Sequence, residues 1–176
     1  MRDVRVIEAG TSVRRCGTCF VCCWIPEVPE LHKPAEILCE FCETGQERGC
    51  QVYERRPESC KNFFCLYAVN KTLPDELRPD RCHVLFEPLA VPSTILALVD
   101  PEFPWSWQTS SVQKLIRSIL NAGIAILISE GADPSALRHI VLPDGRSRED
   151  VMSDIEYSLE VMVGLNYGST DLRNRS

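Results

Sequence analysis

The chain contains 176 residues, of which 44% are hydrophobic and 25% are charged, and its formal net charge is -6 at pH 7. This composition is typical of a folded globular protein and excludes a disordered chain, and the length suits one domain or a small metal module with a compact core. The acidic balance lacks the basic surface that DNA- and RNA-binding proteins carry, so we expect no nucleic-acid partner.

The N-terminal segment carries no recognisable targeting signal. Residues 1–15 are interrupted by charged side chains and lack the apolar core of a signal peptide. Residues 4–8 alternate loosely between apolar and charged side chains, which predicts a short edge strand. The longest apolar stretch after Gly123 covers residues 124–128 and is far too short to span a bilayer. We therefore expect a cytoplasmic protein without a membrane partner.

Ten cysteines distinguish the first half of the chain. Nine of them lie between Cys16 and Cys65, the tenth is Cys82, and none follows it. In a reducing compartment such cysteines do not persist as disulfides, and their density indicates metal binding or catalysis. Inert core cysteines would not cluster in this way, so metal ligation explains the pattern better. The predicted metal ligands are Cys16, Cys19, Cys22, Cys23, Cys39, Cys42, Cys50, Cys60 and Cys65.

The spacing of these cysteines is typical of metal-binding turns. Residues 16–23 read C-x-x-C-x-x-C-C and residues 39–42 read C-x-x-C. In a C-x-x-C turn both sulfurs reach one ion, at about 2.3 Å for zinc. The side chains of the vicinal pair Cys22 and Cys23 diverge, so we expect one of them to face a second site or the core. Nine cysteines exceed one mononuclear site, and either two ions or one polynuclear cluster would account for them.

The cysteine pattern leaves the identity of the metal open. Two C-x-x-C pairs separated by about twenty residues are typical of a four-thiolate zinc ribbon. The bacterial ferredoxin pattern C-x2-C-x2-C-x3-C-P matches residues 16–22 at its first three cysteines, but its fourth is missing and the chain contains no Cys-Pro dipeptide. The predicted cofactor is therefore zinc or iron, and an iron–sulfur cluster is one form that iron would take.

These motifs resemble a family of small bacterial proteins with a zinc- or iron-chelating domain, the YkgJ-like family named for its CxxCxxCC motif. Residues 16–23 carry that motif, and residues 50–63, CQVYERRPESCKNF, are similar to the family's second signature. Residues 28–35 resemble the linker of one proteobacterial branch, which similarly carries a C-x-x-C pair in the place of Cys39 and Cys42. The resemblance covers residues 14–82 and implies that their cysteines chelate zinc or iron.

The residues between the cysteines predict the surroundings of the metal. Pro57 suits the first position of a short helix, which would place Cys60 one turn further on. We expect Arg56 either to hydrogen-bond backbone carbonyls or offset thiolate charge, or to be a plain surface arginine. Lys33 is expected in solvent rather than beside a thiolate. The aromatic residues expected to pack around the site are Trp24, Tyr53, Phe63 and Phe64.

The second half of the chain predicts regular secondary structure, beginning with strands at residues 83–87 and 94–99. Cys82 and His83 are a potential late ligand pair. A core cysteine that begins a strand explains them at least as well, so both stay outside the predicted ligand set. A helix follows from a cap at Ser110 or Ser111. Its apolar residues fall on one face at Val112, Leu115, Ile116, Ile119 and Leu120.

Glycines and a serine mark the remaining element boundaries. Gly123 is placed to end the helix, and the apolar residues 124–128 predict a buried strand. A further strand is expected at 138–142, followed by a turn at Asp144-Gly145. A last amphipathic helix, capped near Ser147, is expected to extend to Met162.

The predicted fold class is α+β. An irregular cysteine-rich module, held together by metal, is expected at residues 1–82, because so few apolar residues cannot form a core alone. A small sheet packed with one or two helices is expected at residues 83–168 and is predicted to share a core with that module. Residues 169–176 are expected to be a frayed tail.

Three functions are compatible with these features. An all-thiolate site favours a metal-binding module with a structural or interaction role and an unidentified protein partner. The second is an iron–sulfur protein in redox or protein-modification chemistry, and the third is a metal buffer or sensor. Flagellin lysine N-methylase carries a similar cysteine-rich domain, but no S-adenosylmethionine-binding loop is recognisable here. No dinucleotide-binding, P-loop or serine-hydrolase motif occurs, so no catalytic residue is predicted.

Overall fold

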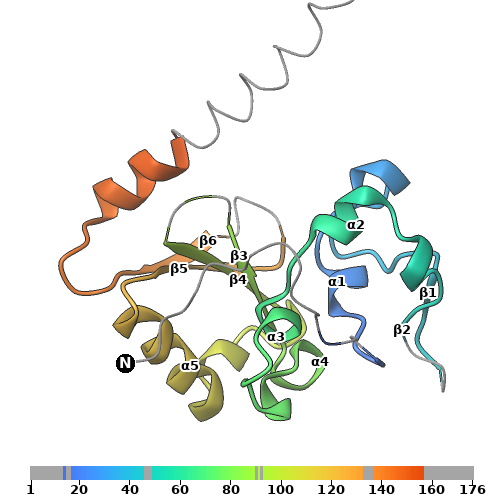
Figure 1. Ribbon diagram of the computed structural model, residues 1–176, viewed down its shortest axis with the longest axis horizontal. Helices are drawn as coiled ribbons and strands as arrows, with labels where there is room; N and C mark the ends of the chain where they lie inside the picture. The colour runs from blue at the N-terminus through green and yellow to red at the C-terminus, as the bar shows by residue number, and fades with distance from the viewer. Residues whose placement is uncertain are drawn as a thin grey trace, which may run out of the picture.

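The computed structural model describes residues 14, 17–45, 49–89, 91, 93–132 and 137–156. The predicted α+β class is confirmed, because a four-stranded sheet packs with helices and stands beside a region of short elements (Figure 1). We call residues 17–65 the cysteine lobe and residues 66–156 the sheet lobe. The strand expected at 4–8, the ligand Cys16 and the tail at 169–176 lie outside the described residues.

Four strands form the sheet of the sheet lobe. Their bounds are Val84–Pro88 for β3, Thr94–Val99 for β4, Ala125–Glu130 for β5 and Leu137–Val141 for β6. The strand order is β3-β4-β5-β6, and only the central pair, β4 with β5, is parallel. A parallel pair needs a crossover connection, and helix α5 (Ser110–Asn121) provides it. The four predicted strands are confirmed within a residue or two at each end.

Helix α5 has the predicted apolar face but a different start. Val112, Ile116 and Ile119 are buried, as their spacing predicts. Neither predicted serine caps the helix: Thr109 is the N-cap, and its hydroxyl donates to the carbonyl of Ser106 at 2.8 Å. The difference arises because a 3-10 turn, η4 (Ser106–Gln108), leads directly into the helix.

Both faces of the sheet are covered, because successive side chains of a strand point to opposite sides. On one face Phe86, Ala97 and Ile126 pack against Val112 and Ile116 of α5. Three short helices join the same core and link the two lobes. Their bounds are Leu66–Val69 for α3, Asp75–Leu77 for η3 and Pro79–Cys82 for α4.

The opposite face of the sheet is shared by two partners. Leu85 and Leu98 pack together with Val21 and Ile25 of the cysteine lobe. Further along, Ala125 and Leu127 pack with Val151, which belongs to a helix at residues 148–156. The sheet therefore supplies the apolar surface on which the cysteine lobe rests.

The last helix begins where the sequence predicts. Ser147 and Asp150 form a reciprocal cap, in which each backbone N–H is bound by the other side chain at 2.8 and 3.1 Å. The turn at Asp144-Gly145 is also confirmed, with Gly145 at a φ of +81°. Helical residues are described as far as 156, so the predicted end of this helix at Met162 lies outside the described residues.

The cysteine lobe is built from very short elements. They are α1 (Val21–Trp24), η1 (Pro29–Leu31), β1 (Cys42–Glu43), β2 (Gly49–Cys50), η2 (Tyr53–Arg55) and α2 (Glu58–Asn62). The longest of them has five residues. This agrees with the irregular structure predicted for this part of the chain. Of the helices that the structure describes, none has both the length and the apolar character to cross a membrane.

Candidate metal centre

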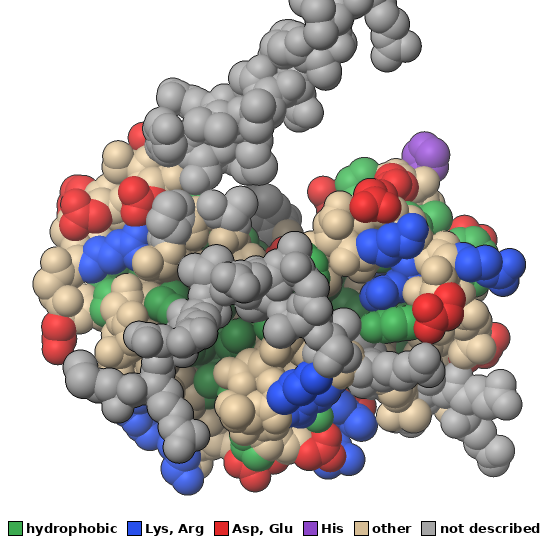
Figure 2. Space-filling view, in the orientation of Figure 1, with side chains coloured by type: hydrophobic (Ala, Val, Ile, Leu, Met, Phe, Trp, Pro, Cys, Tyr) green, Lys and Arg blue, Asp and Glu red, His purple; other side chains and the backbone are tan. Residues whose placement is uncertain are grey.

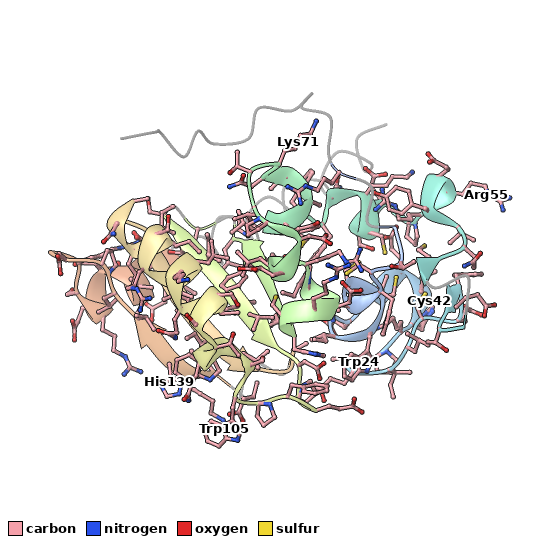
Figure 3. All side chains as sticks on the ribbon, turned by 90° about the horizontal axis from the view of Figure 1, so that it is seen from below. Trp24, Cys42, Arg55, Lys71, Trp105 and His139 are labelled. Atoms are coloured by element: carbon pink, nitrogen blue, oxygen red, sulfur yellow. The ribbon has the colours of Figure 1, made fainter. Side chains whose placement is uncertain are left out.

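Seven cysteine residues from separate segments of the cysteine lobe line one cavity of about 310 Å³. They are Cys19, Cys22, Cys23, Cys39, Cys50, Cys60 and Cys65. All seven belong to the predicted ligand set, which spans residues far apart in the sequence. The labelled Cys42 in Figure 3 marks this lobe, in which α1, α2 and the β1–β2 pair lie close together.

Backbone hydrogen bonds draw three of these segments together. The N–H of Cys39 donates to the carbonyl of Cys23 at 2.9 Å, and the N–H of Cys42 donates to the carbonyl of Cys39 at 2.9 Å. The C-x-x-C turn at 39–42 therefore lies directly against α1. Antiparallel pairing of β1 with β2 then sets Cys50 opposite Cys42.

A close backbone approach holds the hairpin against the first cysteine segment. Gly49 has a φ of +113°, and a Cβ atom there would lie 2.7 Å from the carbonyl oxygen of Gly17. Only glycine fits this contact without a shift of the backbone. The only sequence signal for this role is that a glycine stands next to a cysteine at Gly17 and again at Gly49.

Helix α2 carries Cys60 to the cavity. Pro57 is the N-cap rather than the first helical residue, because its ψ of 159° is extended, and its carbonyl accepts from the N–H of Lys61 at 3.1 Å. Glu30 binds the first turn of α2 by accepting from the backbone N–H of Ser59 at 2.7 Å and from its hydroxyl. These hydrogen bonds lower the pKa of Glu30. The predicted short helix is confirmed with its start shifted by one residue.

One cysteine of the vicinal pair faces the core, as expected, but both also line the cavity. Both Cys22 and Cys23 line the cavity, and the two side chains hydrogen-bond to each other. Cys22 also packs against the core under the lobe, so it contacts both the cavity and the core. Cys23 makes a further side-chain hydrogen bond with Cys42, which joins Cys42 to the group.

The thiols are crowded in a way that disfavours their anionic form without a cation. Burial raises the pKa of Cys19 and of Cys42 to about 12 in each case. The hydrogen bond with Cys22, followed by burial, raises the pKa of Cys23 as well. Burial also raises the pKa values of Cys50 and Cys60, and the charges of neighbouring cysteines add to the effect. A bound metal ion would supply the positive charge that several thiolates in one place require.

Backbone N–H groups already point at two of the sulfurs. The N–H groups of Val21 and Asp80 hydrogen-bond to Cys19, and that of Val52 hydrogen-bonds to Cys50, and each bond offsets part of the rise in pKa that burial causes. Hydrogen bonds of this kind favour the thiolate over the thiol. These sulfurs are buried and also accept hydrogen bonds from N–H groups. A thiolate bound to a metal ion would be stable in such surroundings.

Lys33 is buried, which corrects the expectation of a solvated lysine. Its side chain is only 7% exposed, and its ammonium donates to the carbonyls of Trp24, Pro26 and Pro34, at 2.9, 2.5 and 2.9 Å. Burial lowers its pKa, whereas the negative charges of cysteines, Cys39 first among them, raise it. All three ammonium protons are used, so Lys33 closes the loop between residues 24 and 34 beside the thiols.

The expected aromatic collar is present in part. Tyr53, Phe63 and Phe64 line the cavity. Trp24 does not: it packs against the core beneath the lobe, and its indole N–H donates to the carbonyl of Glu36 at 3.0 Å. The reason is that α1 turns this side chain toward the sheet. Figure 2 shows apolar side chains exposed between charged ones on the cysteine lobe.

Arg56 packs on the aromatic collar and hydrogen-bonds to the backbone, which is the first of its two predicted roles. Its guanidinium lies 3.7 Å from the centre of the Tyr53 ring, and its Nε donates to the Tyr53 carbonyl at 2.7 Å. Burial raises the pKa of Cys50, and the positive charge of Arg56 offsets a small part of that rise. The predicted backbone hydrogen bond is therefore confirmed, and the charge acts on a cavity cysteine.

Cys82 belongs to the core of the sheet lobe. It is buried against Val84 and other residues of the α5 side, and its sulfur hydrogen-bonds to the carbonyls of Leu77 and Val84. Burial raises its pKa to about 11. The interpretation as a core cysteine that precedes a strand is confirmed, because β3 begins two residues later.

The donor chemistry fits zinc and iron–sulfur centres, because clustered thiolates are the soft ligands that both prefer. None of the nine cysteines that the structure describes takes part in a disulfide. In the part of the chain that the structure describes, no three Cys, His, Asp or Glu side chains are arranged as a ready ligand group for one ion. The predicted ligand Cys16 lies outside that part.

Comparison with models of known protein families found no match to this chain, and comparisons with characterised proteins and with solved structures found none either.

Proposed function

We propose that the cysteine lobe holds zinc or an iron–sulfur cluster through cysteine thiolates, and that the centre has a structural or interaction role. The observation that carries this proposal is that seven cysteine residues from separate segments line one cavity. An apolar core does not account for it, because ordinary hydrophobic residues would pack such a space without reactive or titratable atoms.

The architecture of the lobe supports a structural role. Its elements are two to five residues long, and the fully buried side chain that it contributes to the common core is Ile25. Elements of this length have little stability by themselves. Ligand bonds from the cysteines would join the segments and hold them against Leu85 and Leu98 of the sheet. The lobe would then present a fixed surface to a protein partner.

The number of cysteines at the cavity favours a second candidate, an iron–sulfur protein in redox or protein-modification chemistry. Seven lining cysteines exceed the four ligands of a mononuclear site. A cluster in this position would supply electron transfer, and the same cysteines would hold it.

The test is metal and acid-labile sulfide analysis of the full chain purified without oxygen, combined with a visible absorption spectrum. Stoichiometric zinc in a colourless protein supports the structural centre. Iron with sulfide and absorption near ~400 nm supports the second candidate. Ten titratable thiols with no bound metal, in protein that also fails to take up zinc or to accept a reconstituted cluster, would disprove both.

A matched pair of variants assigns the metal to the lobe. Cys60→Ser removes a cavity cysteine, whereas Cys82→Ala removes the cysteine of the sheet core. The proposal requires metal content to fall in the first variant and to persist in the second. Rapid loss of metal to a chelator in the unmodified protein would point instead to metal buffering or sensing.

A further inference from the structure

A histidine–aspartate pair lies in the sheet lobe, outside the cysteine cavity. His83 follows α4 and Asp100 follows β4, and the antiparallel pairing of β3 with β4 brings them together. The backbone N–H of Asp100 donates to the carbonyl of His83 at 3.0 Å, and the imidazole Nδ1 lies 3.0 Å from a carboxylate oxygen of Asp100. Asp100 is only 4% exposed, so its carboxylate is held in place.

The hydrogen bonds around this pair determine which imidazole nitrogen is available. A carboxylate only accepts hydrogen bonds, so Nδ1 of His83 donates to Asp100, and in the neutral tautomer with this proton the lone pair is on Nε2. The other carboxylate oxygen accepts from the backbone N–H of Glu102 at 2.8 Å. The hydroxyl of Ser106 donates to the His83 carbonyl at 3.0 Å and not to the ring. In this tautomer Nε2 is an oriented acceptor.

The histidine opens on a groove of about 690 Å³. Phe103 stacks on one face of the imidazole, with ring centres 3.7 Å apart, which fixes the plane of the ring. Phe103 is 46% exposed and Trp105 is 71% exposed, the largest exposure among the big apolar side chains that the structure describes. Figure 3 shows Trp105 at the surface of the sheet lobe, far from Cys42.

The charged residues of the groove give it a negative character. Arg81 lines it but is ion-paired with Asp75, which neutralises its charge locally. The remaining charged residues of the lining are Glu76 and Glu102. Two carboxylates, an acceptor nitrogen and exposed ring faces are the features that recognise an organic cation, because ring faces and carboxylates attract positive charge.

We propose that the His83 groove binds a small organic ammonium ion, whose N–H donates to Nε2 of His83 while Glu102 and Trp105 offset and cover its charge. An anionic ligand would be repelled by the carboxylates. A divalent metal would require several ligands around one point, and His83 and the two glutamates do not form such a group in the described part of the chain. The site is independent of the metal centre proposed for the cysteine lobe.

The test compares n-butylammonium, n-butanol and butyrate, added to the full chain at constant ionic strength and followed by NMR of the His83 ring and the Trp105 indole. Butylammonium is expected to bind with a Kd on the order of 1–10 mM and to shift both signals, because one hydrogen bond and one cation–ring contact contribute. The neutral and anionic analogues are expected to bind at least about tenfold more weakly.

Variants separate this site from a nonspecific effect. Asp100→Asn replaces the acceptor by an amide that can donate to Nδ1, which moves the ring proton to Nε2 and removes the acceptor from the groove. The 15N shifts of the ring report the tautomer directly, and ammonium affinity is expected to fall about fivefold or more. His139→Gln, which lies outside the groove lining, is the control and should bind normally.

Trp105→Ala keeps the proposal testable if Asp100→Asn does not fold, because Trp105 is exposed and its loss should leave the fold intact. Its affinity for butylammonium is expected to fall about threefold or more. The proposal is overturned if butanol binds as well as butylammonium, if magnesium or zinc binds the groove and the ammonium does not, or if affinity is unchanged in Trp105→Ala.

Discussion

The two lobes differ in what can stabilise them. The sheet lobe contains a twelve-residue helix and strands of five or six residues, with whole faces of Ile, Val and Leu buried on both sides. The cysteine lobe contains elements of at most five residues, and its buried side chains include Cys19, Cys39, Cys42 and Lys33. The same chain therefore combines a conventional apolar core with a region whose interior is made of thiols and hydrogen bonds.

The cysteine lobe is ordered although it has no large apolar core of its own. It rests on the neighbouring sheet through Val21 and Ile25, and its loops are joined by backbone hydrogen bonds and the buried ammonium of Lys33. These contacts bring the cysteines together. Metal binding would then supply the stability that an apolar core supplies in the sheet lobe.

The largest expected effect is that of Cys19→Ser. If metal binding holds the cysteine lobe together, this variant loses stability on the order of 10 kcal/mol in that lobe, because structural metal sites contribute about this much to such modules. Hydrogen exchange is expected to accelerate at residues 17–65 while β4 and β5 stay protected. A variant that keeps its metal content, its melting temperature and its protection would exclude Cys19 as a ligand.

Lys33→Met should have the next largest effect. It keeps the length of the side chain but leaves the carbonyls of Trp24, Pro26 and Pro34 without their donor, which costs about 3 kcal/mol. The loss is expected in urea unfolding and in exchange at residues 24–36. Lys71→Met, at an exposed lysine, is the control and should change stability by less than about 0.5 kcal/mol. Equal effects of the two variants would refute the structural role of Lys33.

The raised pKa of Cys82 predicts that the stability of the sheet lobe depends on pH. Burial raises its pKa from 9.0 to about 11, so the unfolded chain releases this proton first. Its contribution to stability is complete below pH 9 and is lost between pH 9 and 11, at about 1.4 kcal/mol per pH unit and about 3 kcal/mol in total. In urea unfolding under reducing conditions, at pH 8 to 11, the stability of the wild type should fall more steeply than that of Cys82→Ala by this amount, because the other buried thiols contribute equally to both proteins. Parallel profiles would contradict it.

Two glycines provide the smallest and most direct comparison of the lobes. Both Gly49 and Gly123 have positive φ, at +113° and +78°, but a Cβ atom meets the Gly17 carbonyl oxygen at 2.7 Å in the first case and nothing within 4 Å in the second. Gly123→Ala should therefore cost about 1 kcal/mol from backbone strain alone, measured by thermal unfolding. Gly49→Ala should cost about 2 kcal/mol and also lower metal content. If Gly49→Ala retains full metal content, the contact with Gly17 does not position the cysteines.

Most of the sheet lobe could be predicted from sequence because its signals are local. Val112, Ile116 and Ile119 repeat at helical spacing, and Gly123 ends the helix in the conformation that glycine favours. The start of α5 could not be predicted, because the turn of η4 that precedes it leaves no signal in the pattern of apolar residues. The cap at Ser147 was predictable, since its partner Asp150 lies three residues away.

The candidate site likewise has features that the sequence predicts and features that it does not. The cysteine spacing identifies the ligand types and the short turns, and Pro57 indicates the helix that carries Cys60. The positions of Trp24 and Lys33 were mispredicted. A tryptophan next to a candidate ligand usually packs around the site, and a lysine in a polar segment usually lies in solvent. Here the indole packs against the core beneath the cysteine lobe, and three loop carbonyls accept the hydrogen bonds of the ammonium.

The sequence by itself determined the α+β class, the succession of strands and α5 along the chain, and the density of thiols in the first half of the chain. Each of these features depends on residue type and local spacing. Only the tertiary structure decided that cysteines from residue 19 to residue 65 line one cavity, that Lys33 is buried beside them, and that His83 meets Asp100 at a groove. These are contacts between distant segments, and they depend on how the loops lie on the sheet, which no local pattern encodes.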